Sequence, residues 1–418
     1  MKVDIMIEEF DNKKFKIQFF EEDDNRKAVL THYLHNYHNG VKEHFEEEAI
    51  KYLKQIVEYK IEEGKISLVE DLALQQLLFE VENVPFPTPL NYTFKFIDLF
   101  AGIGGFRLAL QNLGGKCIFT SEWDENAKKT YRANFGETPF GDITKEKTKS
   151  FIPEDFHVLC AGFPCQPFSN AGLKKGFEDT RGTLFFDVAD IINRRVEVGN
   201  PIDVIFLENV KGLKNHDKGN TLKTIINTLD ELGYNTSFEI LNSKNFGLPQ
   251  NRERIFIVAW LKEKNLTFKF PVGIGFDESI IYDKDELSKI MLTKVGDILI
   301  QNPESKYTIS DKLFAGHIRR RKEHKEKGNG FGFSSFDKNA PYTSTISARY
   351  YKDGSEILIE QKDANPRKLT PREAAKLQGY PDNYLIPVSD MQAYKQFGNS
   401  VSVPVIQTVF NEIKKQLL

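Results

Sequence analysis

Cysteine is scarce in this sequence. Only Cys117, Cys160 and Cys165 occur among 418 residues, and an odd, small number does not suit a disulfide framework. The three lack a CxxC pair and a clustered histidine, so we expect no metal site. The sequence also lacks any run of about 18 apolar residues and predicts no membrane span. Its acidic, mixed N-terminus is unlike a secretory signal. A reducing, cytoplasmic setting is the simplest expectation.

Charge is nearly balanced in total but unevenly distributed. The formal net charge of −3 argues at first against a nucleic-acid partner. Residues 1–94, however, hold 19 acidic and 11 basic side chains, which leaves 41 acidic and 46 basic ones in the rest of the chain. Residues 312–350 contain nine Lys or Arg against three Asp or Glu. Because distribution matters more than total charge, a basic body behind an acidic first segment is compatible with DNA.

The first segment, residues 1–94, is expected to be mostly helical. Apolar residues recur at helical spacing in VKEHFEEEAIKYLKQIVEYKIEEG, where Gly64 is a C-cap candidate. SLVEDLALQQLLFEVE follows with Ser67 as an N-cap candidate. The proline-rich stretch NVPFPTPLNY then indicates a linker, so we place a boundary near residue 94.

Short apolar strands alternate with helices over residues 95–270. Strand candidates are 95–100, 116–123, 157–163, 203–210 and 254–260, and helical stretches are 106–113, 124–134, 182–198 and 220–232. This alternation predicts an α/β fold built from βαβ units, with a parallel sheet covered on both faces. Ligands of such sheets bind beyond the carboxyl ends of the strands.

The alternation stops after about residue 270. Residues 271–365 are rich in loop-forming and basic residues, with a short strand at EILIE, and indicate a second, smaller domain. In LTPREAAKLQGY, Thr370, Pro371 and Glu373 form a helix-start pattern. A last helix is expected after VSVPV, so residues 366–418 are interpreted as a return to the first domain.

The stretch FIDLFAGIGG predicts a glycine-rich turn between a strand and a helix. Such a turn lets a cofactor approach the backbone. Glu122 follows Gly102 by 20 residues at the end of the next strand, where a carboxylate can take a ribose hydroxyl pair. Arg107 occupies the last glycine position of the dinucleotide pattern GxGxxG, so a non-phosphate adenosyl cofactor fits better. Trp123 either stacks on an adenine or packs as a strand-end aromatic.

The stretch LCAGFPCQPFS places Cys165 directly after an apolar strand candidate, between Pro164 and Pro167. A free thiol has a pKa of roughly 8.5 and needs nearby positive potential to act as a nucleophile. Cys165 is therefore a candidate nucleophile, with a small buried hydrophobe as the alternative. Cys117 and Cys160 lie within strand candidates and are interpreted as core residues.

Two further motifs carry charge at strand ends. FLENV sets Glu208 after four apolar residues, where burial would raise its pKa and make it a candidate acid. A helix N-cap or a ribose ligand is the alternative. In PQNRER, Arg252 and Arg254 are two residues apart and face the same side, which suits phosphate or carboxylate recognition. A solvated strand edge is the alternative for that pair.

The basic stretches HIRRRKEHKEKGNGFGF and YTSTISARYY lie in the small domain. They combine cations with aromatic, glycine and hydroxyl residues, which suits a DNA backbone and groove. For residues 318–327 alone, a solvated charged helix is the alternative.

Read in order, these segments resemble the DNA (cytosine-5)-methyltransferases. The matching stretches are FIDLFAGIGGFRLAL, SEWD, GDIT, GFPCQPFSNAG, RGTLFFD, LENVKGL, NFGLPQNRERIFIVA, RKLTPREAAKLQGYPDNY and QFGNSVSVPV. They run in the family's order from residue 95 to about 407. The resemblance implies a Rossmann-like class I methyltransferase domain that uses S-adenosyl-L-methionine (AdoMet), with a target-recognition domain. Residues 1–94 match nothing in the family and are interpreted as an accessory extension.

The resemblance also implies roles for individual residues. The thiolate of Cys165 would attack C6 of a flipped-out cytosine, and Glu208 would hold N3 and the exocyclic amine. Arg254 would lie near the flipped base, supported by Arg252. By position, the cofactor pocket maps to Phe100, Gly102, Ile103, Gly104, Gly105, Glu122, Trp123, Asp142, Ile143, Pro164, Leu184, Asn399 and Ser400. DNA contacts are expected from Gln166, Ser169, Arg319, Arg320, Thr345 and Arg349.

The small domain is similar to the recognition region of bacterial methylases that modify CC(A/T)GG and related CCNGG sites. This similarity implies a duplex DNA target of that type and a monomeric bacterial enzyme, functionally linked to a cognate restriction endonuclease. Three alternatives stay open: a tRNA cytosine methylase, a non-catalytic DNA-binding regulator, and a nicotinamide oxidoreductase, which Arg107 disfavours.

Overall fold

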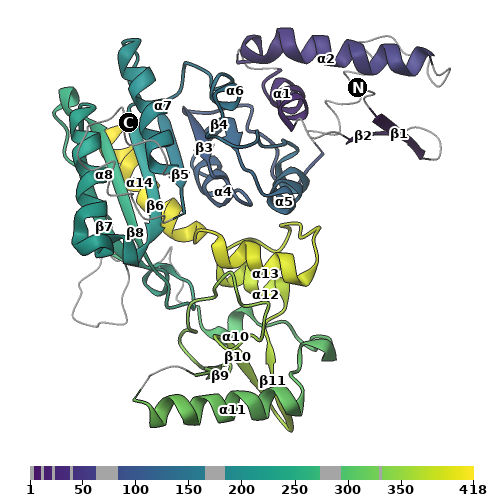
Figure 1. Cartoon of the computed structure of the whole chain (residues 1–418), viewed down its shortest axis with the longest axis vertical. Coiled ribbons are helices and arrows are strands. Elements are labelled where there is room, and N and C mark those ends of the chain that lie inside the picture. Colours follow the sequence, from purple (N-terminus) through teal and green to yellow (C-terminus); the bar gives the residue numbers. More distant parts are fainter. Residues whose placement is uncertain are drawn as a thin grey trace.

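A computed structural model of the chain describes residues 4–10, 14–20, 24–37, 41–62, 83–164, 184–273, 293–328 and 332–418. Its main body contains a six-stranded sheet in the order β4-β3-β5-β6-β8-β7 (Figure 1). The strands are β3 (Phe94–Leu99), β4 (Gly115–Ser121), β5 (Val158–Gly162), β6 (Val204–Val210), β7 (Tyr234–Asn242) and β8 (Glu253–Leu261).

The sheet is mixed, so the prediction of a parallel sheet is wrong at one edge. Strand β3 is parallel to β4 and β5, and β5 is parallel to β6. Strand β8 is antiparallel to both of its neighbours, β6 and β7. No helix of crossover length separates β7 from β8, so the chain returns in the opposite direction. The sequence did not predict β7, whose residues are mostly half-buried at the sheet edge rather than continuously apolar.

Helices cover both faces of the sheet. On one face, α4 (Gly105–Gln111), α5 (Glu125–Phe135) and α14 (Val403–Leu417) contribute to one apolar core. On the other face, α7 (Leu184–Glu197) and α8 (Asn220–Glu231) contribute to a second core. The predicted stretches match these helices closely, except that α14 begins inside VSVPV rather than after it. Its buried residues recur at helical spacing, and the Phe410 ring lies 4.9 Å from the Phe94 ring of β3.

The C-terminal segment connects the main body to a smaller part at the bottom of Figure 1, the lower part, which contains the elements between Val295 and Lys368. Helix α12 (Pro371–Leu377) begins with the predicted capping box, since Glu373 N donates to Thr370 Oγ1 and Thr370 N donates to the Glu373 carboxylate. Helix α13 (Asp390–Asn399) follows and lies beside α12 (Figure 1). Because α14 then packs on α4, the chain returns to the first half of the sheet.

The lower part holds a three-stranded sheet in the order β11-β10-β9. Its elements are β9 (Ser335–Phe336), β10 (Leu358–Gln361), β11 (Ala364–Lys368), α10 (Val295–Ile298) and α11 (Asp311–Glu326). The charged-helix alternative for residues 318–327 is confirmed by α11. This helix has no apolar stripe, because His317 is its single buried residue, and so periodicity could not reveal it. Domain boundaries near residues 94, 270 and 365 stay a prediction.

The N-terminal segment combines a hairpin with two helices. Strands β1 (Asp4–Phe10) and β2 (Lys14–Phe20) pair antiparallel, a feature that the sequence analysis did not predict. Helix α1 (Asp24–His35) precedes α2 (Glu43–Glu62), which confirms the helix predicted there. The cap candidates Gly64 and Ser67 lie outside the described residues. Both helices bury apolar residues in the second core of the main body.

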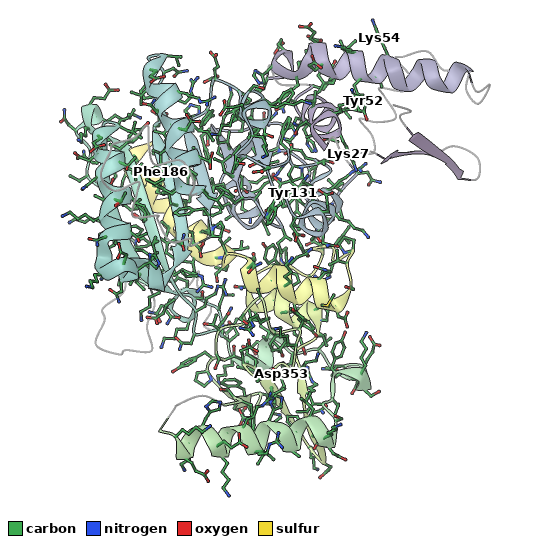
Figure 2. All side chains as sticks on the ribbon, viewed as in Figure 1. Lys27, Tyr52, Lys54, Tyr131, Phe186 and Asp353 are labelled. Atoms are coloured by element: carbon green, nitrogen blue, oxygen red, sulfur yellow. The ribbon has the colours of Figure 1, made fainter. Side chains whose placement is uncertain are left out.

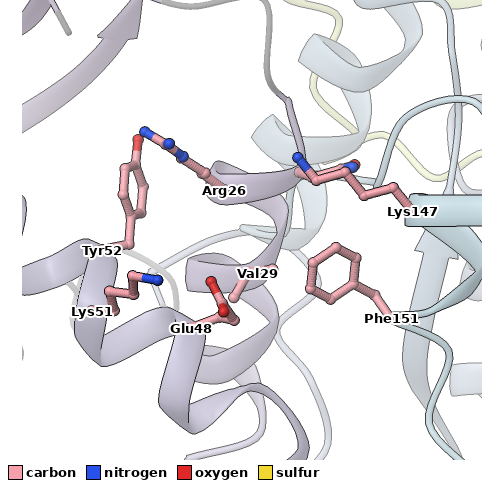
Figure 3. Close-up of a pocket in the computed structure, with 8 residues that line it drawn as sticks. Arg26, Val29, Glu48, Lys51, Tyr52, Lys147 and Phe151 are labelled. Atoms are coloured by element: carbon pink, nitrogen blue, oxygen red, sulfur yellow. The ribbon is translucent and has the colours of Figure 1, made fainter.

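A half-open pocket of about 170 Å³ lies where α1 and α2 meet α6 (Glu146–Lys149). Figure 3 shows its lining, which consists of Asn25, Arg26, Val29, Glu48, Lys51, Tyr52, Lys147 and Phe151. Within the described ranges, no helix is long and apolar enough to cross a bilayer. The same ranges contain no cluster of three or more His, Cys, Asp or Glu side chains suited to a metal ion.

Candidate active site

The glycine-rich turn joins β3 to α4 with several residues in the left-handed region. Phe100 has φ of 56°, Gly102 of 56° and Gly104 of 82°. A left-handed conformation costs a non-glycine residue about 1–2 kcal/mol, so Phe100 stores strain at this position. No atom lies within 4 Å of where a Cβ of Gly102 would stand. The turn therefore leaves open space above its backbone for a ligand.

The carboxylate of Glu122 is fixed by backbone donors from this turn and from the next strand end. Its Oε2 accepts from Gly102 N at 2.8 Å, and its Oε1 accepts from Trp123 N at 2.9 Å and Asp124 N at 2.8 Å. Burial raises the pKa of Glu122, and the three N–H donors oppose that rise. The Trp123 side chain beside it is 78% exposed, so the alternative of a packed strand-end aromatic is wrong. An exposed indole next to a fixed carboxylate is suited to an adenosyl group.

The C-terminal motif QFGNSVSVPV packs against the same turn. A Cβ on Gly105 would stand 2.5 Å from Val401 Cγ2 and 2.8 Å from Tyr380 Oη. The Tyr380 and Ser400 hydroxyls are hydrogen-bonded at 2.7 Å. Lys395 lies on α13, the helix that directly precedes Ser400, and its Nζ pairs with Asp124 Oδ2 at 2.8 Å. Ser400, which the sequence places in the cofactor pocket, is thus brought next to the glycine turn across almost 300 residues of chain.

The other expected cofactor residues differ in exposure. Ile103 and Ile143 are each 3% exposed, and the Ile103 carbonyl accepts from the Tyr384 hydroxyl, so both belong to the core. Asp142 is half-exposed, and its Oδ1 accepts from Thr144 N at 3.0 Å. Pro164 and Asn399 are exposed, and half-buried Leu184 begins α7.

Glu208 and Arg254 form a buried ion pair at the ends of neighbouring strands. Arg254 Nε lies 3.2 Å from Glu208 Oε1. The two residues are diagonal neighbours, because Glu208 is paired with Phe256 and Arg254 with Val210 in the antiparallel ladder of β6 and β8. Burial raises the pKa of Glu208, while the guanidiniums of Arg254 and Arg252 oppose the rise. A carboxyl with a raised pKa that keeps one cation as its ion-pair partner is suited to hold and transfer a proton.

Asn209 connects this pair to the PCQ segment. Its Nδ2 donates to the Phe163 carbonyl at 2.8 Å, two residues before Cys165. Gly162 is paired with Glu208 in the β5–β6 ladder, and a Cβ there would stand 3.7 Å from Glu208 Oε2. The chain therefore enters the PCQ segment directly beside Glu208. Cys165, Gln166 and Ser169 lie outside the described residues.

Arg252 has a different environment from Arg254. Its buried guanidinium donates to the carbonyl oxygens of Ile346 at 3.1 Å, Gly398 at 3.1 Å and Ser400 at 2.7 Å. Burial lowers its pKa to about 9, which still leaves the group charged at neutral pH. Arg252 therefore ties the loop of the lower part to the C-terminal motif, whereas Arg254 contacts Glu208.

The expected DNA-contacting residues divide into two groups. Thr345 Oγ1 donates to the Asn251 carbonyl at 2.6 Å, which places Thr345 and Ile346 beside the QNRER segment. Arg349, four residues after Thr345, is exposed. Arg319 and Arg320 lie on α11 at the far end of the lower part (Figure 1). Arg320 is held by Asp353 Oδ2 at 3.1 Å and by His317, so it stabilises the lower part internally. Asp353 lies within that part (Figure 2).

One buried acid in the site region was not singled out from the sequence. Asp98 of β3 is fully buried, and burial raises its pKa to about 8 although the Arg107 guanidinium opposes the rise. It is therefore mainly neutral at pH 7. The signal was present, because FIDLF places one carboxyl inside an apolar strand.

Substituting Gly104 tests the construction of the glycine turn. Its Cβ would stand 2.3 Å from Phe135 Cε2, so Gly104→Ala should lower the free energy of unfolding by about 2–5 kcal/mol through backbone strain and overpacking together. Gly102→Ala has the same sign of φ but open space, and should cost only about 1–2 kcal/mol. Urea denaturation of both variants measures the difference. Equal losses would contradict the packing argument.

Three comparisons with known proteins agree with this geometry. The family model for C-5 cytosine-specific DNA methylases matches residues 94–415. The type II methyltransferase M.SsoII of Shigella sonnei is 53% identical over 336 residues, covering 79% of this chain and 83% of that protein. The type II methyltransferase M.HpaII of Haemophilus parainfluenzae is 49% identical over 368 residues, covering 84% and 97%.

A likeness to solved structures concerns the fold alone. The Dnmt2 methyltransferase of S. pombe matches with a TM-score of 0.58 at 19% identity, covering 77% of this chain and 98% of that one. The family-model match extends over the glycine turn, the Glu208–Arg254 pair and the C-terminal motif. The chain therefore belongs to the family of C-5 cytosine-specific DNA methylases.

Proposed function

We propose that this enzyme transfers a methyl group from AdoMet to C5 of a flipped-out cytosine in duplex DNA, through a covalent bond between Cys165 and C6. The observation that carries the proposal is the buried Glu208–Arg254 pair beside the entry to the PCQ segment. A carboxyl with a raised pKa, beside the point where the chain leads into a candidate nucleophile's segment, suits the activation of a cytosine ring.

The residues of the glycine turn fit AdoMet. The open space above Gly102, the fixed carboxylate of Glu122 and the exposed Trp123 indole match a close backbone approach, a ribose hydroxyl pair and an adenine face. Asp142, Pro164, Leu184, Asn399 and Ser400 would complete the pocket. When bound, AdoMet supplies an electrophilic methyl group on a sulfonium centre. Phe100 and Gly104 hold the turn in the conformation that leaves this space.

The reaction needs a nucleophile and an acid from the protein. The Cys165 thiolate forms a bond to C6, and the electron pair of the C5=C6 bond moves into the ring while Glu208 gives its proton to N3. C5 would then take the methyl group that bound AdoMet supplies, with the electron pair of the broken S–CH3 bond staying on the cofactor's sulfur, and N3 returns its proton to Glu208. A base or water removes the C5 proton, and the electron pair of that C–H bond expels the sulfur from C6. Arg254 keeps Glu208 in place throughout.

The proposed target is a CCNGG-type site read by the lower part of the molecule. Thr345 and Arg349 lie on the loop that Arg252 ties to the catalytic body, which favours them as contacts over Arg319 and Arg320 on the distant α11. Gln166 and Ser169 would approach the DNA from the PCQ loop. Similarity to type II methyltransferases supports a role in a restriction–modification system. In that role the protein would act as a monomer that protects DNA from a cognate endonuclease.

Bisulfite sequencing of DNA from a methylation-deficient host that expresses the protein tests this proposal. We expect protected cytosines at one position of a CCNGG-type site and none in cells that express Cys165→Ser. Protected cytosines in another context would contradict the target but not the reaction. Unprotected DNA accompanied by methylated tRNA would contradict the DNA substrate.

A further inference from the structure

A row of buried charged and polar side chains links helix α1 to the main body. His32 Nε2 lies 3.1 Å from Glu137 Oε1, and Arg107 Nη1 lies 2.9 Å from the same oxygen. Arg107 Nη1 also donates to the Tyr131 hydroxyl at 3.0 Å, and Tyr131 lies within the main body (Figure 2). All four side chains are fully buried, and they come from α1, the loop after α5, α4 and α5.

The charges of these side chains are complementary. Burial alone would raise the pKa of Glu137, yet Arg107 and His32 hold it well below its usual range, so Glu137 is ionised. The His32 ring lies between two acceptors, because its Nδ1 is 2.8 Å from the Ala28 carbonyl and its Nε2 faces Glu137. Removing one member leaves a buried charge with fewer partners, which is costly.

Further hydrogen bonds fix α1 at the same place. Thr88 Oγ1 accepts from Arg107 Nη2 at 3.0 Å and lies 2.6 Å from His35 Nδ1. Burial lowers the pKa of His35 to about 3, so this ring is neutral. Thr138 N donates to Thr31 Oγ1 at 3.0 Å. The inner side of the junction is therefore dense with polar contacts, whereas its outer side holds the half-open pocket (Figure 3).

Two routes lead from His32 to the cofactor residues. Through Glu137, it contacts Arg107, whose guanidinium lies 4.9 Å from the centre of the Phe135 ring that packs against Gly104. The second route begins at the Phe140 ring, whose centre lies 4.7 Å from the centre of the His32 ring.

The second route continues through the backbone of Phe140. The Phe140 carbonyl accepts from Glu122 N at 2.8 Å, and Phe140 N donates to the Thr120 carbonyl at 2.8 Å. His32 thus supports both the turn and the carboxylate of the expected AdoMet site.

We infer that helix α1 is a positioning element of the AdoMet pocket and that His32 is its positioning residue, setting the affinity for AdoMet through Glu137–Arg107 and Phe140. The inference rests on the proposed function, because AdoMet is its ligand. The family model begins at residue 94, so α1 lies outside the part of the chain that the family shares. Residues 1–94, which the sequence indicates to be an accessory extension, then contribute a helix that supports the cofactor site.

The test compares two His32 variants with a variant at the pocket rim. His32→Leu should raise the AdoMet Kd and KM by roughly tenfold and leave kcat at saturating AdoMet within about twofold. A tenfold change in Kd corresponds to about 1.4 kcal/mol, which is a usual magnitude for coupling through such contacts. His32→Gln keeps one N–H donor toward Glu137 and should recover most of the affinity. Lys51→Ala, at the outer side of the same junction, should leave the Kd unchanged. Calorimetric titration with AdoMet gives the Kd.

Several outcomes separate positioning from mere stability. A folded His32→Leu protein with the wild-type Kd overturns the inference, as does a fall in kcat without a rise in KM. Where His32→Leu does not fold, His32→Gln carries the test, and a Kd equal to that of the wild type overturns the inference. A wild-type protein that binds DNA but no AdoMet would contradict the proposed function itself.

Discussion

Cys165→Ser should lower the rate of methyl transfer by roughly six orders of magnitude, the scale on which loss of a catalytic nucleophile lowers kcat in other enzymes. A serine hydroxyl is not ionised near neutral pH and cannot add to C6 as a thiolate does. Transfer of labelled methyl groups from AdoMet to duplex DNA measures the rate. DNA that carries 5-fluorocytosine at the target measures the covalent step separately, since fluorine cannot leave as the proton does and the adduct persists.

The matched control for this prediction is Cys160→Ala. Cys160 lies five residues earlier on β5, is fully buried, and has a thiol pKa that burial raises well above its usual range. It cannot supply a thiolate, so its removal should change stability and leave the adduct intact. Wild-type methyl transfer by Cys165→Ser, or loss of the adduct in Cys160→Ala alone, would contradict the assignment.

Glu208→Gln should lower kcat by a factor on the order of 10²–10⁴, the usual contribution of a positioned proton donor. The amide keeps the volume of the side chain but cannot pass a proton to N3. Burial raises the pKa of Glu208, so its protonated form persists to higher pH than that of an exposed glutamate. As pH rises through that pKa the proton is lost, and kcat of the wild type should fall, whereas kcat of Glu208→Gln should not show this fall.

Glu253→Gln provides the control for Glu208. Glu253 is next to Arg254 in sequence but pairs with Lys211 at 2.8 Å near the surface. Its removal should leave both kcat and the pH profile unchanged. Single-turnover measurements over a pH series, at saturating AdoMet and DNA, compare the three proteins. A high-pH fall that survives in Glu208→Gln would assign the titration to another group.

The catalytic elements could be predicted because each left a local pattern. The strands that end at Leu99, Ser121, Gly162 and Val210 are short, mainly apolar runs. The glycine turn, Glu122, Cys165 and Glu208, which lie at or just after those ends, marked the ligand zone. The capping box at Thr370 and the glycine turn are likewise local, since a few neighbouring residues determine them. The ordered motifs added the family, which spacing alone left open.

The remaining features depend on contacts that are distant in sequence. The half-buried β7 and the direction of β8 follow from which sheet edge was left to pair, and α11 has no apolar stripe to reveal it. The pairing of His32 with Glu137 joins residues that are 105 positions apart. Nothing local distinguishes a histidine that will meet a buried carboxylate from one on a surface helix.

Arg252 has a consequence for how target preference can change. All three of its acceptors are main-chain oxygens, which every residue type provides. Side chains of the loop around Ile346, which we propose contacts DNA, can therefore be exchanged without removing the hydrogen bonds that hold this loop to the main body. Gly398 is the exception, because a Cβ there would stand 2.3 Å from the carbonyl of Ser347. Diversification of sequence specificity is thus compatible with an unchanged joint, on condition that this one glycine is kept.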